Sequence, residues 1–282
     1  MEPSLSSVLD FARQIAEEAG QLLMQGRSQL QSADVETKSS ARDLVTQVDR
    51  DCESFLVSKI QSRFPKDEIL AEEGGLRPGA NTTSWCIDPL DGTVNFVQGL
   101  PFFSVSIARI SNGKPDLAVV HLPVLKETFF ATLGGGAYLN ESSIRVSSKT
   151  ETMDSVLATG FPYRRNELAE NNLENFNRMF LQVRGIRRMG SAAIDLAYVA
   201  AGKLDAFWEL HLSPWDVAAG ALLVTEAHGT VDTIVPGGDW LHEKNILAGP
   251  SQLVDEVREI LLRGREPDYP NLGDLDAAEK KE

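Results

Sequence analysis

The sequence predicts an α/β protein, in which an α+β N-terminal half and an α/β C-terminal half form one layered sandwich. Three observations lead to this prediction. Apolar residues recur at helical spacing from Leu5 to Leu23, short strand-like runs separated by turn residues fill positions 105–146, and strand-like and helical stretches alternate after about residue 150. No internal repeat or Pro-rich linker separates the halves, so we expect them to share one interior.

The predicted elements follow one another along the chain with recognisable starts and ends. A long amphipathic helix opens the chain and ends near Gly26, and a second helix follows Asp49 and ends before Pro65. Residues 105–146 are typical of an antiparallel meander, because turn residues interrupt them at short intervals. In the C-terminal half we expect strands at 155–160, 183–189, 205–210 and 245–249, and helices at 166–181, 192–201 and 214–227.

Length and composition are those of a globular enzyme with an excess of acidic groups. Of the 282 residues, 42% are hydrophobic and 24% are charged, which is ordinary for a soluble globular protein. We divide the chain into residues 1–147, residues 148–265 and a solvated acidic tail at 266–282. The formal net charge of −14 makes nucleic acid an unlikely partner and favours bound cations.

The cysteines and the N-terminus predict a cytoplasmic protein. Cys52 and Cys86 both lie in apolar stretches without metal-ligand spacing, which indicates a reducing compartment. The first 20 residues lack a basic segment followed by an apolar one, and no apolar run approaches the roughly 20 residues that span a bilayer. We therefore expect neither a signal peptide nor a membrane partner.

Residues 85–96 carry the most informative motif, in which an apolar strand leads directly into two carboxylates. Asp88 and Asp91 stand three residues apart across a Pro-containing turn, so both side chains can point into one site beyond the strand. The Leu90 carbonyl can join them. Mg²⁺ prefers such oxygen ligands, which makes a metal site the functional interpretation. The alternative is a tight Asp-Pro turn with no ligand.

The residues that follow this motif predict a phosphate site and a base. Gly92 and Thr93 open a helix whose free N–H groups can hold a phosphate next to the cation site. Asp49 stands at the start of the second helix, where it is either an N-terminal cap or a base. As a base it would act through the Thr93 hydroxyl to deprotonate a metal-bound water.

Three further sites allow a functional and a structural interpretation. Glu72 follows the strand at 69–71, so it either bridges metal ions or belongs to a solvent-facing acidic turn. Asp216 lies in the first turn of a helix that a Ser-Pro pair begins, so it either caps that helix or holds a second metal. The segment Gly190-Ser191-Ala192 either caps the next helix or offers N–H and O–H groups to a sugar-like hydroxyl.

These segments, in this order, resemble the inositol monophosphatase family over nearly the whole chain. The family signatures GEE, WxIDPLDGTxNF and WDxAAGxLLVxEAGG are matched at 71–73, 85–96 and 215–229, with Ala71 and His228 in place of glycines. Neither departure removes a ligand. The resemblance implies a layered αβαβα sandwich of the sugar phosphatase type, usually assembled as a homodimer.

The resemblance also implies which residues hold two to three Mg²⁺ ions. Glu72, Asp88 and the Leu90 carbonyl hold the first ion, and Asp88, Asp91 and Asp216 hold the second. Glu72 helps to hold a third.

The same resemblance assigns the remaining candidate residues. Asp49 and Thr93 match the pair that activates the attacking water, and Glu72 belongs with them to the catalytic group. The amides of Gly92 and Thr93 match the phosphate-binding positions. The residues implied in binding the alcohol are Asp91, Gly190, Ser191, Ala192, Glu209 and Asp216.

The predicted function is Mg²⁺-dependent hydrolysis of a small phosphorylated polyol by a metal-activated water. Inositol 1-phosphate is the first candidate substrate, because Glu209 can accept hydrogen bonds from ring hydroxyls. Histidinol phosphate, fructose 1,6-bisphosphate and 3′-phosphoadenosine 5′-phosphate are the alternatives. The resemblance further implies inhibition by lithium.

Two other functions compete with this one. The run Asp91-Gly92-Thr93 is superficially similar to the motif of phosphatases with an aspartyl nucleophile, but Pro89 intervenes and the two acids stand three apart rather than two. A regulatory protein that binds the transcription machinery is the alternative from another class, because bacterial relatives of the family can act in transcription complexes.

Overall fold

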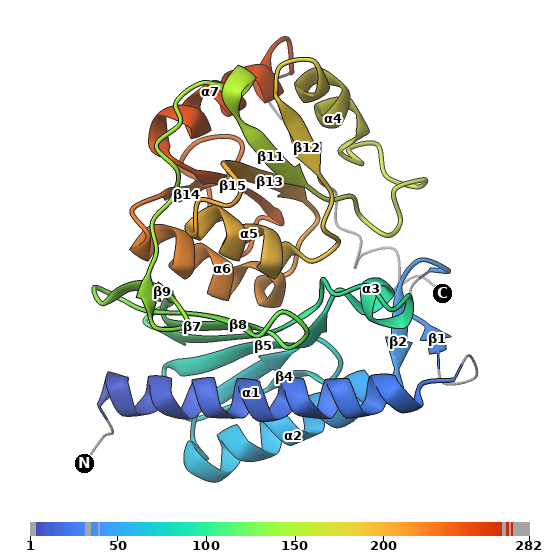
Figure 1. Cartoon of the computed structure of the whole chain (residues 1–282), viewed down its shortest axis with the longest axis vertical. Coiled ribbons are helices and arrows are strands. Elements are labelled where there is room, and N and C mark those ends of the chain that lie inside the picture. The colour runs from blue at the N-terminus through green and yellow to red at the C-terminus, as the bar shows by residue number, and fades with distance from the viewer. Residues whose placement is uncertain (1–3, 32–34, 39, 267–268, 271, 273–282) are drawn as a thin grey trace.

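The structure, a computed structural model, describes residues 4–31, 35–38, 40–266, 269–270 and 272. Its helices and sheets alternate in five layers, which Figure 1 shows from the α1 side to the α7 side. The αβαβα order that the family resemblance implied is therefore confirmed. The helices of the layers are α1 (Leu5–Gln29) and α2 (Gln47–Arg63) on one outer face, α5 (Ala192–Ala200) and α6 (Pro214–Glu226) between the sheets, and α4 (Leu173–Phe180) and α7 (Ser251–Leu262) on the other outer face.

The first sheet is formed by the N-terminal half of the chain, in the order β10-β9-β8-β7-β6-β5-β3-β4. All neighbouring strands are antiparallel except β3 and β5, which run parallel. The predicted meander is confirmed by β6 to β10. The strands are β3 (Glu68–Ala71), β4 (Gly75–Arg77), β5 (Thr83–Asp91), β6 (Ser104–Ser111), β7 (Lys114–Leu122), β8 (Glu127–Thr132), β9 (Gly136–Leu139) and β10 (Ser142–Ser143).

The second sheet belongs to the C-terminal half, in the order β12-β11-β13-β15-β14. Strand β11 pairs in parallel with both of its neighbours, whereas β15 pairs antiparallel with β13 and β14. Its strands are β11 (Val156–Thr159), β12 (Gly185–Arg187), β13 (Ala206–Leu210), β14 (Thr230–Asp232) and β15 (Asn245–Gly249). The remaining elements are the strand pair β1 (Val35–Thr37) and β2 (Leu44–Thr46), the short helix α3 (Thr93–Val97) and a 3₁₀ turn, η2 (Thr152–Asp154).

Helix α1 forms as its periodicity predicts, but it is longer than expected. Val8, Ala12, Ile15, Ala19 and Leu23 are buried at helical spacing. The helix continues three residues beyond Gly26, because this glycine packs closely on α2. An added Cβ at Gly26 would lie 2.6 Å from the Val48 side chain.

The α5–α6 layer joins the two halves through small side chains. Both helices are rich in buried alanine, and the core cluster that contains them also includes Cys86, Phe129 and Phe207 from the two sheets. Gly220 allows α6 to approach α5 closely, since an added Cβ would lie 2.5 Å from Leu196 Cβ. One core cluster is therefore shared by the two halves, and small residues make this close packing possible.

The helix expected at 166–181 begins seven residues later than predicted, at Leu173. Asn172 has a left-handed backbone conformation, with φ 71°, which does not continue a helix. Its side-chain amide donates to Thr159 Oγ1 at 2.8 Å and to the Gly160 carbonyl at 2.7 Å. Residues 161–172 therefore form a loop, which contributes to the wall of the cavity described below.

The segment expected to be a solvated tail is partly anchored. Tyr269 is only 6% exposed and packs in the core beneath the second sheet, where Arg265 lies over its ring. Residues 273–282 lie outside the described part of the chain. Among the residues that the structure describes, no helix combines the length and the apolar character needed to cross a membrane.

Candidate active site

A bulge in strand β5 explains how two acids three residues apart come to face one site. Asp88 pairs with Ser106 of β6 and Asp91 pairs with Ser104, so three steps along β5 correspond to two along β6. An extra residue of this kind re-aims the side chains that follow it. The expected Asp-Pro turn is thus a bulge inside a continuous strand, and the Leu90 N–H donates back to Asp88 Oδ1 at 2.9 Å.

The four carboxylates predicted as metal ligands act electrostatically on one another. Asp88 is 2% exposed, and burial, followed by the charges of Glu72, Asp91 and Asp216, raises its pKa well above the usual value. Burial likewise raises the pKa of Glu72 to about 7 and that of Asp91 to about 6. It also raises the pKa of Asp216, to which the charge of Asp91 adds. The fold therefore brings together the acids that lie far apart in the sequence.

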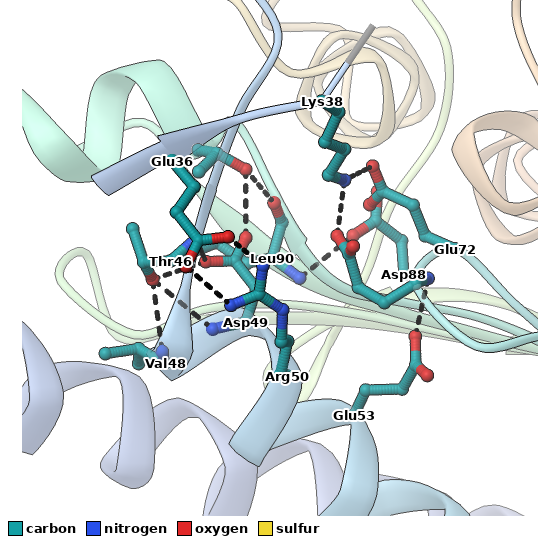
Figure 2. Close-up of polar contacts among 12 residues, drawn as sticks. Glu36, Lys38, Thr46, Val48, Asp49, Arg50, Glu53, Glu72, Asp88 and Leu90 are labelled. Carbon is teal, nitrogen blue, oxygen red and sulfur yellow. Dashed lines mark hydrogen bonds and ion pairs between the residues drawn. The ribbon is translucent and has the colours of Figure 1, made fainter. Parts of the chain in front are cut away.

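Glu72 is held by a lysine from the β1–β2 region, as Figure 2 shows. Lys38 Nζ donates to Glu72 Oε1 at 2.8 Å and also to the carboxylate of Glu73. Glu73 is tied in turn to α2, because its N–H donates to Glu53 Oε2 at 2.7 Å. Glu72 does lie in a turn, but its side chain is 23% exposed and is ion-paired with Lys38 rather than pointing freely into solvent.

The other two acids are anchored to the C-terminal half. Asp91 Oδ2 accepts from the Ser191 hydroxyl at 2.6 Å and from the Ala193 N–H at 2.8 Å. Asp91 is thereby hydrogen-bonded to the first turn of α5. Asp216 Oδ2 accepts from the Ser213 N–H at 2.7 Å in a capping box. The structural and the functional interpretation of Asp216 are therefore compatible, because one carboxylate both caps α6 and faces the acids of β5.

The donor set fits magnesium chemically. Carboxylate and carbonyl oxygens are the hard ligands that Mg²⁺ prefers, and a divalent cation stabilises the ionised form of carboxylates that otherwise raise one another's pKa. Within the described ranges, no group of three or more His, Cys, Asp or Glu side chains is arranged as it stands to hold a metal ion. Lys38, the Ser191 hydroxyl and the Ser213 N–H each donate to one of the predicted ligands, Glu72, Asp91 and Asp216. A carboxylate has about four lone-pair sites, so these bonds leave room for a cation.

Asp49 and Thr93 form the contact that the sequence suggested. The Thr93 hydroxyl lies 3.1 Å from Asp49 Oδ1 and 3.2 Å from the Leu90 carbonyl oxygen. Asp49 Oδ2 accepts from the N–H and the hydroxyl of Thr46, at 2.9 and 2.5 Å, in a capping box at the start of α2 (Figure 2). Asp49 is 1% exposed, and burial raises its pKa. It is therefore both a cap and the partner of Thr93.

Gly92 makes the turn from β5 into α3 possible. Its φ of +97° favours glycine, and an added Cβ would lie 2.9 Å from the Phe102 carbonyl oxygen and 3.3 Å from that of Gly190. Thr93 is the first residue of α3 and is buried. The backbone after the carboxylates is thus close-packed on both the β6 side and the α5 side.

A cavity of about 930 Å³ opens beside these acids. Asp91 and Asp216 reach it from the metal-ligand group, and the predicted alcohol-binding residues Gly190, Ser191, Ala192 and Glu209 also line it. A volume of this size accommodates a small organic ligand. Two of the predicted metal ligands therefore share one space with the predicted alcohol contacts.

Glu209 is buried in the wall of this cavity. It lies in β13, is 8% exposed, and fills the space beside Gly160, where an added Cβ would lie 2.1 Å from Glu209 Oε1. Burial raises the pKa of Glu209 to about 8, although Arg188 opposes the shift. At neutral pH the carboxyl is then mostly protonated and can donate as well as accept a hydrogen bond.

The raised pKa of Glu209 predicts a specific dependence of stability on pH. Between about pH 4.5, the usual value, and about pH 8, the folded protein holds a proton that the unfolded chain releases, so stability falls as pH rises through this window. The loss is on the order of 5 kcal/mol. The Glu209→Gln variant lacks this loss. Its Tm, measured in EDTA, should therefore fall less between pH 5 and pH 8.5 than the Tm of the parent protein.

The control is Glu141→Gln, because the Glu141 side chain is 88% exposed. It should follow the parent's pH dependence. An equal fall of Tm in the parent and in Glu209→Gln would show that Glu209 is ionised throughout this pH range.

Several residues in or near the cavity are not among the site residues predicted from the sequence. Asp195 is 1% exposed, lines the cavity, and its Oδ1 has no hydrogen-bond partner among the described residues. An acid inside the apolar helix segment AAIDLAYVA was the available signal. Lys38, Arg42 and Arg188 carried no such signal, because their roles depend on which distant residues they face. His211 also lines the cavity, and its Nε2 lies 2.8 Å from the Glu170 carbonyl oxygen.

Comparisons with known proteins show which family the chain resembles in sequence and fold. Residues 4–262 match the sequence pattern of the inositol monophosphatase family. The Nus factor SuhB of Pseudomonas aeruginosa is 44% identical over 252 residues, which cover 87% of this chain and 92% of that protein. The crystal structure of the extragenic suppressor protein SuhB from Bartonella henselae has a TM-score of 0.87 at 39% identity, covering 92% of this chain and all of the other. The inositol monophosphatase structure from Anabaena has a TM-score of 0.83 at 35% identity, covering 97% of this chain and 99% of the other.

Proposed function

This chain belongs to the inositol monophosphatase family, and from that premise we propose that it is a Mg²⁺-dependent phosphatase of small phosphorylated polyols, with inositol 1-phosphate as its preferred substrate. The observation that carries the proposal is the group of buried acids around Asp88, whose charges act on one another beside a cavity of suitable size. An aspartyl-nucleophile phosphatase is not consistent with membership of this family.

In this proposal the acids hold the metal ions and the cavity holds the alcohol. Glu72, Asp88 and the Leu90 carbonyl hold one Mg²⁺, Asp88, Asp91 and Asp216 hold a second, and Glu72 contributes to a third. When bound, Mg²⁺ supplies positive charge that stabilises the phosphoryl oxygens and the departing alkoxide.

Thr93 and Asp49 carry the proton of the attacking water. The single Thr93 hydroxyl proton can be donated to Asp49 Oδ1, 3.1 Å away, which leaves the Thr93 oxygen free to accept from a water. As that water attacks phosphorus, its proton passes to Thr93 while the Thr93 proton passes to Asp49. Burial raises the pKa of Asp49, which makes it a stronger base than an exposed aspartate.

The backbone and the cavity wall then position the substrate. The amides of Gly92 and Thr93 are proposed to hold the phosphate at the end of β5. Ser191 is fixed by its hydrogen bond to Asp91, so it presents the segment that begins at Gly190 in one orientation. Together with Ala192, it faces the same cavity as Glu209, whose carboxyl is proposed to bind ring hydroxyls.

A phosphate-release assay tests the proposal. We expect release from inositol 1-phosphate in Mg²⁺, with a higher kcat/KM than from histidinol phosphate, fructose 1,6-bisphosphate or 3′-phosphoadenosine 5′-phosphate. EDTA should abolish release, and Li⁺ should inhibit it. A different best substrate would overturn the inositol preference alone, whereas no release from any of the four would overturn the proposed activity.

A second candidate function comes from the relatives named Nus factor SuhB. We propose that this chain can also bind the transcription machinery. Affinity capture with the full chain should then recover RNA polymerase in stoichiometric amounts, and Asp88→Asn should bind equally well if the two functions are separate. Capture without polymerase would leave the phosphatase as the only proposed function.

The cellular setting is proposed on the same family basis. The family resemblance supports a homodimer, and Cys52 and Cys86, which are both free and buried, are consistent with the cytoplasm. Sedimentation of the full chain would test the oligomeric state.

A further inference from the structure

Asp195 is a buried acid in the cavity wall with an oxygen that lacks a protein donor. It lies in α5 and is 1% exposed. Its Oδ1 has no hydrogen-bond partner among the described residues, although the residue lines the cavity. Buried polar atoms in folded proteins are nearly always hydrogen-bonded, so an exception in a cavity wall indicates that a molecule in the cavity supplies the donor.

The start of α5 places Asp195 beside the predicted alcohol contacts. Asp195 stands four residues after Ser191 and three after Ala192, and residues at these spacings lie on one face of a helix. All three line the cavity. The Ser191 hydroxyl and the Ala193 N–H donate to Asp91, which fixes this turn at the end of β5. Asp195 therefore extends the wall that the Gly190-Ser191-Ala192 segment begins.

Glu209 reaches the same cavity from the second sheet. It lies in β13, on which α5 packs. Burial, followed by the charge of Glu209, raises the pKa of Asp195 well above its usual value, so the two carboxyls are close enough to act on each other. Among the described residues, no hydrogen bond contributes to the pKa shift of either acid. The helix and the strand therefore present two carboxyls without described donors to one cavity.

The charges around this pair favour hydroxyl groups as the missing donors. An ammonium group also donates to carboxyls, but the same cavity is lined by four arginines, Arg42, Arg164, Arg165 and Arg188. The charge of Arg188 acts on both acids, which offsets their attraction for a further cation. A hydroxyl is neutral and can both donate and accept a hydrogen bond, so it suits a carboxyl in either protonation state.

We propose that Asp195 is a specificity-determining residue that acts with Glu209, each carboxyl binding a different hydroxyl of the alcohol. This inference rests on the proposed function, because it takes the cavity as the place of the alcohol. It defines the substrates as phosphorylated polyols that carry at least two further hydroxyls. An alcohol without them leaves both carboxyls unpaired and is a poorer substrate.

The test compares inositol 1-phosphate with cyclohexyl phosphate, which has a six-membered ring without further hydroxyls, as substrates in Mg²⁺. Asp195→Ala should lower the ratio of kcat/KM for inositol 1-phosphate to that for cyclohexyl phosphate by about ten- to a hundredfold. Asp195→Leu also lacks the acid but fills its place. It should give a similar loss, and it replaces the alanine variant in the test if that variant does not fold.

Two further variants separate hydrogen bonding from packing. Asp195→Asn should keep most of the ratio, because an amide can accept from a hydroxyl and donate to it. Asp255→Ala is the control, since Asp255 lies on α7 outside the cavity and its side chain is 72% exposed. It should leave the ratio unchanged.

A second readout does not depend on catalysis. In EDTA, myo-inositol should raise the Tm of the parent protein and of Asp195→Asn, and Asp195→Ala should lose most of this increase. If no substrate releases phosphate but this Asp195-dependent stabilisation is present, the proposed function fails and the hydroxyl-binding pair stands.

Two results would overturn the role of Asp195. An unchanged ratio in both Asp195→Ala and Asp195→Leu would mean that the acid serves the fold or acts on both substrates equally. A larger loss of kcat/KM with histidinol phosphate than with inositol 1-phosphate would assign the pair to an amine instead.

Discussion

Asp88→Asn is expected to reduce Mg²⁺-dependent phosphate release by about 10³-fold or more, while making the metal-free protein more stable. The loss follows because Asp88 is the acid shared by two proposed metal sites, and removing one such electrostatic group costs at least two to three orders of magnitude. Asparagine keeps the acceptor for the Leu90 N–H, so the bulge of β5 should persist.

The gain in stability follows from the pKa of Asp88. Burial and the charges of Glu72, Asp91 and Asp216 raise that pKa well above its usual value of 3.8. Ionisation of Asp88 therefore costs the folded protein stability as pH rises above about 4, and the uncharged variant lacks this contribution. In EDTA, the Tm of Asp88→Asn should exceed that of the parent by more at pH 8 than at pH 5.

Asp10→Asn is the matched control, since Asp10 is exposed on α1. It should change neither phosphate release nor Tm. Phosphate release at the wild-type rate by Asp88→Asn would show that this residue does not hold the metal. An unchanged Tm in EDTA would mean that the charge of Asp88 is already compensated within the protein.

Thr93→Val and Asp49→Asn are each expected to lower kcat by about 10²- to 10⁴-fold, which is the usual effect of removing a positioned proton acceptor. Thr93→Ser should retain most of the activity, because it keeps the hydroxyl that lies 3.1 Å from Asp49 Oδ1. If the two residues act as one relay, the double variant should be hardly slower than either single variant.

The structural role of Asp49 gives a different result. Asp49 accepts from the Thr46 N–H at 2.9 Å, and loss of a cap costs about 0.5–2 kcal/mol of stability without changing the chemical step. A fall in Tm with unchanged kcat would therefore identify Asp49 as a cap only. Asp51→Asn, on the exposed side of the same helix, is the control for both measurements.

Some features of this site follow from neighbouring residues in the sequence, and others depend on contacts between distant segments. The apolar run into Asp88 and Asp91 is a local pattern, and the strand that it predicts is present. The bulge was not predicted, because it depends on the register with β6. Similarly, the composition of the segment around 166–172 is compatible with a helix, but the bonds of Asn172 to Thr159 and Gly160 decide for a loop.

The residues of the candidate site also fall into those that the sequence predicts and those that only the fold reveals. The sequence predicts the acids because each stands at the end of a strand or the start of a helix, and the neighbouring residues indicate these positions. Arg165 and Arg188 were not found, since an arginine in a polar segment is ordinary until the groups around it are known. The fold brings them to one cavity with Arg42, where the charge of Arg188 acts on Asp91 and Glu209.

By itself, the sequence determined the alternation of helices and strands, the set of acids and the family, because periodicity and motif spacing are properties of adjacent residues. Only the tertiary structure decided which side chains meet. Thr93 contacts Asp49 across 44 positions, and Ser191 contacts Asp91 across 100. Charge repulsion, burial and hydrogen bonding act over a few ångströms in space, so the electrostatics of the cavity exist only once the layers have packed.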